Sequence, residues 1–196
     1  MTLRDRNLME KFDMRNKLIF ALPLALMATP ALAQSQGGDV TGTVDIDGSV
    51  EGRCLFTTDN AVIHLGELAL GGTGATAGKL DTSKVNGQTA TLIGWCNNTS
   101  ATMSVETTEL TNSATAPTGF DNRIDYTATA TNPNSDSASD SSLTAGAGTP
   151  TNVGMFTGDI DVELSTSSTP NGGLLVAGDY TGNVVVTLSP NFAPPT

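Results

Sequence analysis

Few side chains in this sequence could do chemistry. His64 is the only histidine among 196 residues, and no second imidazole is available to share a metal with it. The sequence has no Gly-x-Ser-x-Gly turn, no phosphate-binding P-loop and no dinucleotide-binding glycine pattern, so nucleophilic catalysis has no recognisable residues. We therefore predict that the protein is not an enzyme and uses no cofactor.

Closely spaced carboxylates come nearest to a metal-ligand pattern. Asp45 and Asp47 form one pair, and Asp159, Asp161 and Glu163 form a second group. Residues two apart on a strand share its polar face, so a solvated strand face explains both groups. Weak calcium binding is the alternative, because carboxylate oxygens suit that ion, but neither group has the EF-hand spacing. No metal site is predicted.

The first 33 residues have the pattern of a secretory signal peptide. Met14–Lys17 is basic, Leu18–Met27 is apolar, and Ala31–Ala33 is a small-residue cleavage site. Residues 1–13 are a charged lead-in that a signal peptide does not need, which makes Met14 an alternative start. We expect the mature chain to be exported.

The mature chain, expected to begin near Gln34, is strongly acidic. It has four basic side chains against 17 acidic ones, a net charge of −13. Nucleic acid and anionic membrane surfaces are therefore disfavoured partners, and no later segment has the ~20 apolar residues of a spanning helix. The 163 residues from 34 to 196 suit one domain, 49–196, preceded by a short arm, 34–48.

The chain has two cysteines, Cys54 and Cys96. An even number in an exported chain favours one disulfide over two free thiols. Neither lies in a CxxC motif or beside a histidine, which would indicate redox chemistry or metal binding. We therefore predict a structural disulfide between them.

Segments with the composition of β-strands recur along the mature chain. Ile160–Leu164 alternates apolar and polar residues, as a strand with one buried face requires. Turn clusters such as Gly71–Gly74 and Pro170–Gly173 separate these segments. This pattern predicts an all-β sandwich. Its expected strands are Val40–Phe56, Val62–Leu65, Thr89–Trp95, Ala101–Thr107, Arg123–Thr131, Met155–Leu164 and Asn183–Leu188.

Two segments are expected to lie outside the strands. Asn132–Pro150 has too little apolar content to bury, so we expect a mobile, solvated loop, with ligand recognition as the alternative role. The tail Ser189–Thr196 contains three prolines, which donate no ladder hydrogen bonds. The final strand should therefore end near Leu188.

The residues just after the cleavage site form a strand-like arm. From Val40 to Val50, apolar or glycine positions alternate with polar ones, which is typical of a strand with a single apolar face. The positions on that face include Val40, Gly42, Val44, Ile46 and Gly48. An arm of this kind, a few residues before a disulfide-tied domain, indicates pairing with another strand.

Three motifs follow one another along the chain. The first is this arm, with glycines between large apolar residues. The second runs from Cys54 through Ile63–Gly66 to Thr91–Cys96, and the third is Ala177–Leu188. Together they resemble the chaperone–usher pilin subunits, especially those that carry the spore coat protein U domain. In the third motif the residues that match the family's closing strand are Gly178, Asp179, Tyr180, Val184, Val186 and Leu188.

The resemblance implies an incomplete immunoglobulin-like β-sandwich, the pilin fold, that lacks its seventh strand. In that family a donor strand from the arm of the next subunit completes the sandwich. Val40, Val44 and Ile46 would then fill pockets, while Gly42 and Gly48 would allow close approach. Ordinary strand breaks are the alternative explanation of the two glycines.

The function that the resemblance implies is a structural subunit of a surface pilus or fimbria. It would polymerise head to tail and support adhesion or biofilm formation. Its partners would be identical or related subunits, a periplasmic chaperone and an outer-membrane usher. Two other functions stay open: an adhesin module that binds a carbohydrate or another receptor, and a secreted coat protein whose arm fills its own groove.

Overall fold

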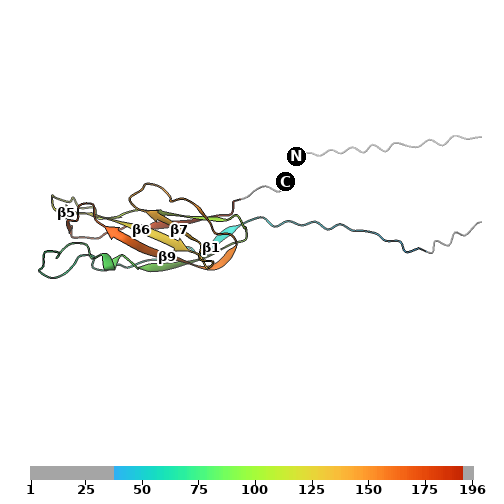
Figure 1. Ribbon diagram of the computed structural model, residues 1–196, viewed down its shortest axis with the longest axis horizontal. Coiled ribbons are helices and arrows are strands. Elements are labelled where there is room, and N and C mark those ends of the chain that lie inside the picture. Colours follow the sequence, from blue (N-terminus) through green and yellow to red (C-terminus); the bar gives the residue numbers. More distant parts are fainter. Residues whose placement is uncertain (1–37, 192–196) are drawn as a thin grey trace, which may run out of the picture. The chain divides into compact units, whose positions relative to one another are not determined.

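The computed structural model describes residues 38–191 (Figure 1). The predicted signal peptide, residues 34–37 of the predicted arm and residues 192–196 of the proline-containing tail lie outside the described residues. The described residues fall into two units, divided between Asp47 and Gly48. Within residues 38–191, no helix is long and apolar enough to cross a membrane.

The second unit is built almost entirely of β-strands, which confirms the predicted all-β fold class. The part of the chain that the structure describes has one short 3-10 helix, η1 (Thr82–Lys84). The strands are β1 (Cys54–Thr58), β2 (Thr89–Cys96), β3 (Thr102–Thr107), β4 (Leu110–Thr111), β5 (Phe120–Asp121), β6 (Arg123–Thr131), β7 (Ser137–Ser141), β8 (Thr151–Asn152), β9 (Phe156–Ser168), β10 (Leu174–Leu175) and β11 (Val184–Ser189).

Two antiparallel sheets make up most of the domain. The larger sheet has the order β1-β2-β9-β6-β4, with β7 also paired to β6, and the smaller has the order β11-β3-β8. Figure 1 shows β6, β7 and β9 at the centre of the domain. A short parallel pair, β10 with β5, lies outside both sheets.

The core lies between these sheets and contains mostly small and β-branched side chains. Alternate residues of β9 point inward, and Ile160, Val162 and Leu164 are buried while the carboxylates between them are exposed. From the smaller sheet, Met103 and Val105 are fully buried in the same cluster. This alternation is the physical basis of a two-layer, sandwich-like fold.

Five predicted strands are confirmed within a few residues of their expected ends. They correspond to β2, β3, β6, β9 and β11. The predicted disulfide is also confirmed, and it joins Cys54 at the start of β1 to Cys96 at the end of β2. These two residues are Cα partners in the antiparallel register of β1 and β2, so the disulfide closes one end of that strand pair.

The predicted strand Val40–Phe56 is wrong over most of its length. A strand begins only at Cys54, and residues 38–53 have no strand assignment. Period-two alternation gives an extended segment one apolar face, but a strand also requires a neighbour that pairs with its backbone N–H and C=O groups. No backbone hydrogen bond of residues 38–50 occurs in the described part of the chain.

The prediction for Val62–Leu65 is also wrong, for the same physical reason. These residues form no strand. Ile63 and Leu65 nevertheless pack against the core, whereas Val62 and His64 are exposed. The alternation is therefore real, but the segment has no strand partner among residues 38–191.

The predicted loop Asn132–Pro150 is wrong because its middle forms β7. Ala138 and Asp140 alternate inward and are buried, and β7 pairs with β6. The Asp140 carboxylate accepts hydrogen bonds from Thr107 N (2.8 Å) and Thr107 Oγ1 (2.7 Å). A hydrogen-bonded carboxylate and an alanine can be buried without large apolar side chains.

Candidate functional site

An apolar groove of about 640 Å³ opens between the two sheets beside β11. We call it the β11 groove. Its floor and walls come from the larger sheet, from β11 and from the segment that follows β1. The apolar and aromatic residues that line it are Phe56, Ala61, Val62, Ile63, Leu65, Ala90, Leu92, Leu110, Tyr126, Val162, Leu164, Val184, Val185 and Val186.

The floor of the groove is the inner face of the larger sheet. Phe56 on β1 and Leu92 on β2 are only half-buried although they point to the core side. Val162 and Leu164, further into the same sheet on β9, are buried. Burial therefore decreases from β9 toward β1 across one continuous sheet.

One wall of the groove is β11, whose backbone is paired along one edge. β11 pairs with β3 over all six of its residues, from Val184 to Ser189. No strand pairs with its other edge among residues 38–191. In an antiparallel strand, alternate residues direct their backbone N–H and C=O groups to opposite edges, so half of these groups face away from β3.

The opposite wall is the segment Asp59–Glu67, where the sequence predicted a strand. Its backbone makes no hydrogen bond to backbone within the described residues. Ile63 and Leu65 anchor it on the core, and Val62 is exposed. The β11 groove thus lies between two stretches of backbone with free hydrogen-bonding groups.

Gly94 on β2 brings the two sheets together at one end of the larger sheet. A Cβ atom there would lie 3.1 Å from Leu55 O, 3.3 Å from Phe56 Cδ1 and 3.4 Å from Leu188 Cδ1. Any side chain at this position would push β1 or β11 outward. Leu188 therefore packs close to Phe56 at this end of the domain.

Tyr126 on β6 connects the larger sheet to the beginning of β11. Its hydroxyl donates a hydrogen bond to Asn183 O at 3.3 Å, and the residue is buried. Burial, helped by the charge of Glu109, raises the pKa of Tyr126 to about 12. The phenol is therefore a neutral donor that holds the residue before β11 at physiological pH. Sequence reasoning missed Tyr126, although its place in an alternating strand pattern was a signal.

The residues of the third motif have separate positions in the structure. Val184 and Val186 line the β11 groove, and Leu188 packs on the core beside it. Tyr180 lies apart from the groove lining, and its hydroxyl donates to Asp121 O and Val176 O, both at 3.0 Å. Gly178 has φ +133°, and a Cβ atom there would lie 2.7 Å from Asn112 Nδ2. Asp179 is exposed.

The predicted arm is described from Gly38 onward. Val40, Val44 and Ile46 are exposed, with 89%, 84% and 90% of their surface accessible to solvent. Cβ atoms built at Gly42 and Gly48 would contact nothing within 4 Å. The arm therefore presents a row of large apolar side chains to solvent.

The chain is anchored where it enters the domain. Asn97 Nδ2 donates to Glu51 O at 3.0 Å, and Asn97 N donates to Arg53 O at 3.0 Å. A Cβ atom at Gly52 would lie 2.7 Å from Asn98 Nδ2. Residues 51–53 therefore lie tightly against the end of β2.

The carboxylates of the sequence patterns lie on exposed strand faces or in the arm. Asp159, Asp161 and Glu163 are exposed on β9, and Asp161 Oδ1 accepts a hydrogen bond from Thr91 Oγ1 at 2.8 Å. Residues 38–191 contain no group of three or more acidic, histidine or cysteine side chains that could hold a metal ion.

Comparisons of the chain with protein-family models, with curated proteins and with solved structures gave no match.

Proposed function

We propose that the β11 groove binds a β-strand supplied by the arm of another copy, and that the protein is a structural subunit of a surface pilus. The observation that carries this proposal is an apolar groove that lies between two free backbone edges. Binding of an added strand uses both features, since the backbone supplies hydrogen bonds and the pockets accept alternate side chains.

The arm has the chemistry that such a groove requires. Val40, Val44 and Ile46 lie on one face of an extended segment, with Gly42 between the first two. Burying these three side chains would contribute roughly 5–9 kcal/mol, at about 1.5–3 kcal/mol each. This estimate excludes the cost of association, which offsets part of it.

The lengths of the two partners also agree. β11 has six residues, and the arm from Val40 to Ile46 spans seven positions. At about 3.3 Å per residue, each would extend roughly 20 Å. One arm could therefore pair with the whole length of β11.

Exchange of arms between copies generates a filament. The arm and the groove are different surfaces of the same chain, so each added copy presents a new free groove or arm. Head-to-tail contacts of this kind do not close in pairs and give open fibres unless the rotation closes a ring. A free groove and strand edge are prone to aggregate, so the subunit would require a periplasmic chaperone and an outer-membrane usher before assembly, as the pilin resemblance implies.

The test is to remove the arm and supply it as a peptide. A chain that lacks residues 34–48 should unfold at a lower temperature than the assembled protein, and a synthetic peptide of residues 34–48 should raise that temperature. A control peptide with V40S, V44S and I46S keeps the backbone but loses the apolar face, so it should have little effect.

Two results would oppose the proposal. One is a truncated chain that neither binds the native peptide nor gains stability from it. The other is equal binding of the native and control peptides, since the apolar face would then have no role. A full-length chain that stays monomeric and never exchanges its arm would instead support self-complementation.

A further inference from the structure

A second cavity, of about 600 Å³, lies near β5 and shares no residue with the β11 groove. We call it the β5 cavity. It forms where the connection between β4 and β5 meets the connection between β9 and β10. Its volume is in the usual range of small-molecule binding sites, about 300–1,000 Å³.

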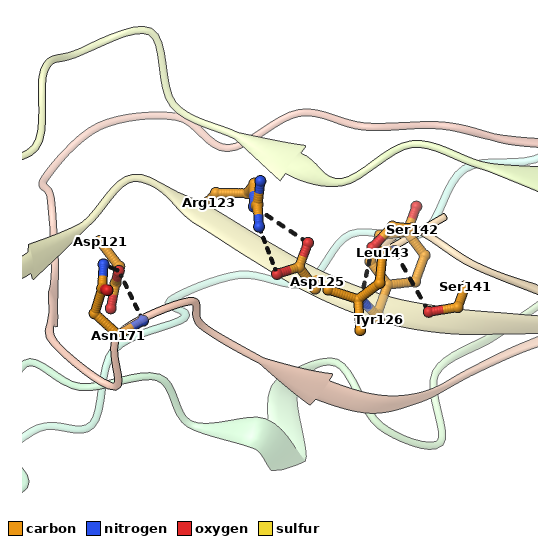
Figure 2. Close-up of polar contacts among 8 residues, drawn as sticks. All are labelled: Asp121, Arg123, Asp125, Tyr126, Ser141, Ser142, Leu143 and Asn171. Atoms are coloured by element: carbon orange, nitrogen blue, oxygen red, sulfur yellow. Dashed lines mark hydrogen bonds and ion pairs between the residues drawn. The ribbon is translucent and has the colours of Figure 1, made fainter. Parts of the chain in front are cut away.

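Asp121 fixes the shape of this cavity by joining the two connections. Its buried carboxylate accepts a hydrogen bond from Gly173 N at 2.7 Å. It also accepts one from Asn171 Nδ2 at 2.8 Å, and Figure 2 shows these two side chains together. Burial by itself raises the pKa of Asp121, but the hydrogen bonds from Gly173 and Asn171 outweigh it and hold the pKa below its ordinary value. The carboxylate therefore stays ionised and keeps these donors in place.

Close backbone packing adds to this rigidity. A Cβ atom at Gly173 would lie 2.6 Å from Gly119 O, so only glycine allows the two connections to touch there. Asn122 Nδ2 donates to Ala114 O at 2.8 Å, which holds the β4–β5 connection against β5. The cavity is consequently formed before any ligand arrives.

The lining combines an aromatic surface with hydrogen-bond donors. Phe120 is exposed, with 37% of its surface accessible. Arg123 pairs with the buried Asp125 through Nε to Oδ1 at 3.2 Å and Nη2 to Oδ2 at 3.3 Å (Figure 2). Because a guanidinium has five N–H donors, this pair leaves three of them for another acceptor.

The charges of the site disfavour anionic ligands. Asp125 balances the charge of Arg123, and Asp121 adds a buried negative charge at the cavity wall. The mature chain also has a net charge of −13, which repels anions in general. A neutral ligand that is rich in oxygen acceptors and has one apolar face fits both the donors and the ring.

We propose that the β5 cavity binds a neutral pyranose sugar, with Phe120 against its apolar face and the free N–H groups of Arg123 donating to its hydroxyl oxygens. A sugar ring has the required acceptors, and its C–H face can pack on an aromatic ring. The cavity shares no lining residue with the groove, so this site is independent of strand binding.

The test measures binding of four methyl glycosides, those of glucose, galactose, mannose and N-acetylglucosamine, to the full mature chain by saturation-transfer NMR titration. At least one should bind, and F120A should raise its Kd at least tenfold. F120L retains an apolar side chain without the ring, so it keeps the fold if F120A does not. It should raise the Kd about three- to tenfold, because stacking on a ring is lost.

The matched control is L143A, which removes an exposed apolar side chain that lines neither cavity. This variant should bind the glycoside like the wild-type chain. The proposal is overturned if none of the four glycosides binds, or if F120L and L143A bind the sugar equally well. Methyl glucuronide, which carries a carboxylate, should bind less well than methyl glucoside, and a preference for the anion would also contradict the proposal.

Discussion

Val105 and Val186 are Cα partners on neighbouring strands, yet they lie in two different environments. Val105 on β3 is fully buried beneath the larger sheet, whereas Val186 on β11 is half-buried and lines the groove. Both are valines in alternating strands of the same sheet. The difference lies in their neighbours. Besides its pairing with β11, β3 pairs with β8 at Thr102 and Met103, and Val105 O accepts a hydrogen bond from Gly148 N at 2.8 Å, whereas β11 has one partner strand among residues 38–191. A strand with one unpaired edge can therefore have the same apolar alternation as a strand whose residues are fully buried.

Removal of the disulfide should lower the unfolding free energy more than any other change proposed here. Cys54 and Cys96 join the edge strand β1 to β2, and Phe56 and Leu92 on these two strands are only partly buried. The double variant C54A/C96A should lose about 4 kcal/mol of unfolding free energy, because the closed loop is long. Urea denaturation of the oxidised wild-type chain and of the variant measures this loss of unfolding free energy. A loss below about 1 kcal/mol would mean that packing alone holds this edge.

The two valines allow a matched test of closed and open packing. V105A should cost about 2–3 kcal/mol, because it leaves a cavity in a fully buried site. V186A should cost the chain lacking residues 34–48 about 1 kcal/mol or less, since its side chain is already partly hydrated. With the arm peptide bound, the cost of V186A should rise, and denaturation with and without peptide checks this. If V186A cost the same unfolding free energy with and without the peptide, the half-buried state of Val186 would not result from a missing strand.

Substitution of Asp140 tests whether β7 contributes to the stability of the domain on the buried side of β3. D140A should cost about 2 kcal/mol, because Thr107 N and Oγ1 would remain buried without an acceptor. The exposed Asp159 on β9 provides the control, and D159A should change stability by less than about 0.5 kcal/mol. Equal effects of the two variants would favour the mobile loop that the sequence predicts.

Asp121 gives a smaller, pH-dependent effect. Its pKa is lowered in the folded protein, so its ionised form stabilises the fold above the pKa of the unfolded chain. This contribution should be lost as pH falls through the folded pKa. The stability advantage of the wild-type chain over D121N should therefore shrink between about pH 5 and pH 2. Thermal unfolding across this range measures it, and a constant difference would mean that the charge of Asp121 has no role.

The fold was predictable from sequence where a segment that buries apolar residues at alternate positions also has a partner strand, which Val62–Leu65 lacks among residues 38–191. β9 shows this, since Ile160, Val162 and Leu164 were identifiable from their spacing alone. β7 was not predictable, because its buried face consists of Ala138 and Asp140. Burial of that carboxylate depends on Thr107, which lies 33 residues away in sequence.

The groove was only partly predictable, for a different reason. Val184 and Val186 were candidates by resemblance, but Phe56, Leu92 and Tyr126 were not identified as its lining. Which residues line the groove depends on which strands pair, since β2 pairs with β1 and β9 while β11 pairs with β3. Local periodicity carries no information about these pairings. The β5 cavity depends in the same way on long-range contacts of Asp121.

Hydrogen exchange of the β11 backbone tests the central claim most directly. In a chain lacking residues 34–48, the β11 amides that point away from β3 should exchange rapidly, and those bonded to β3 should exchange slowly. Addition of the peptide of residues 34–48 should slow the first set strongly, since each amide gains a partner in the added strand. Bound peptide with unchanged exchange of these amides would contradict strand addition at β11.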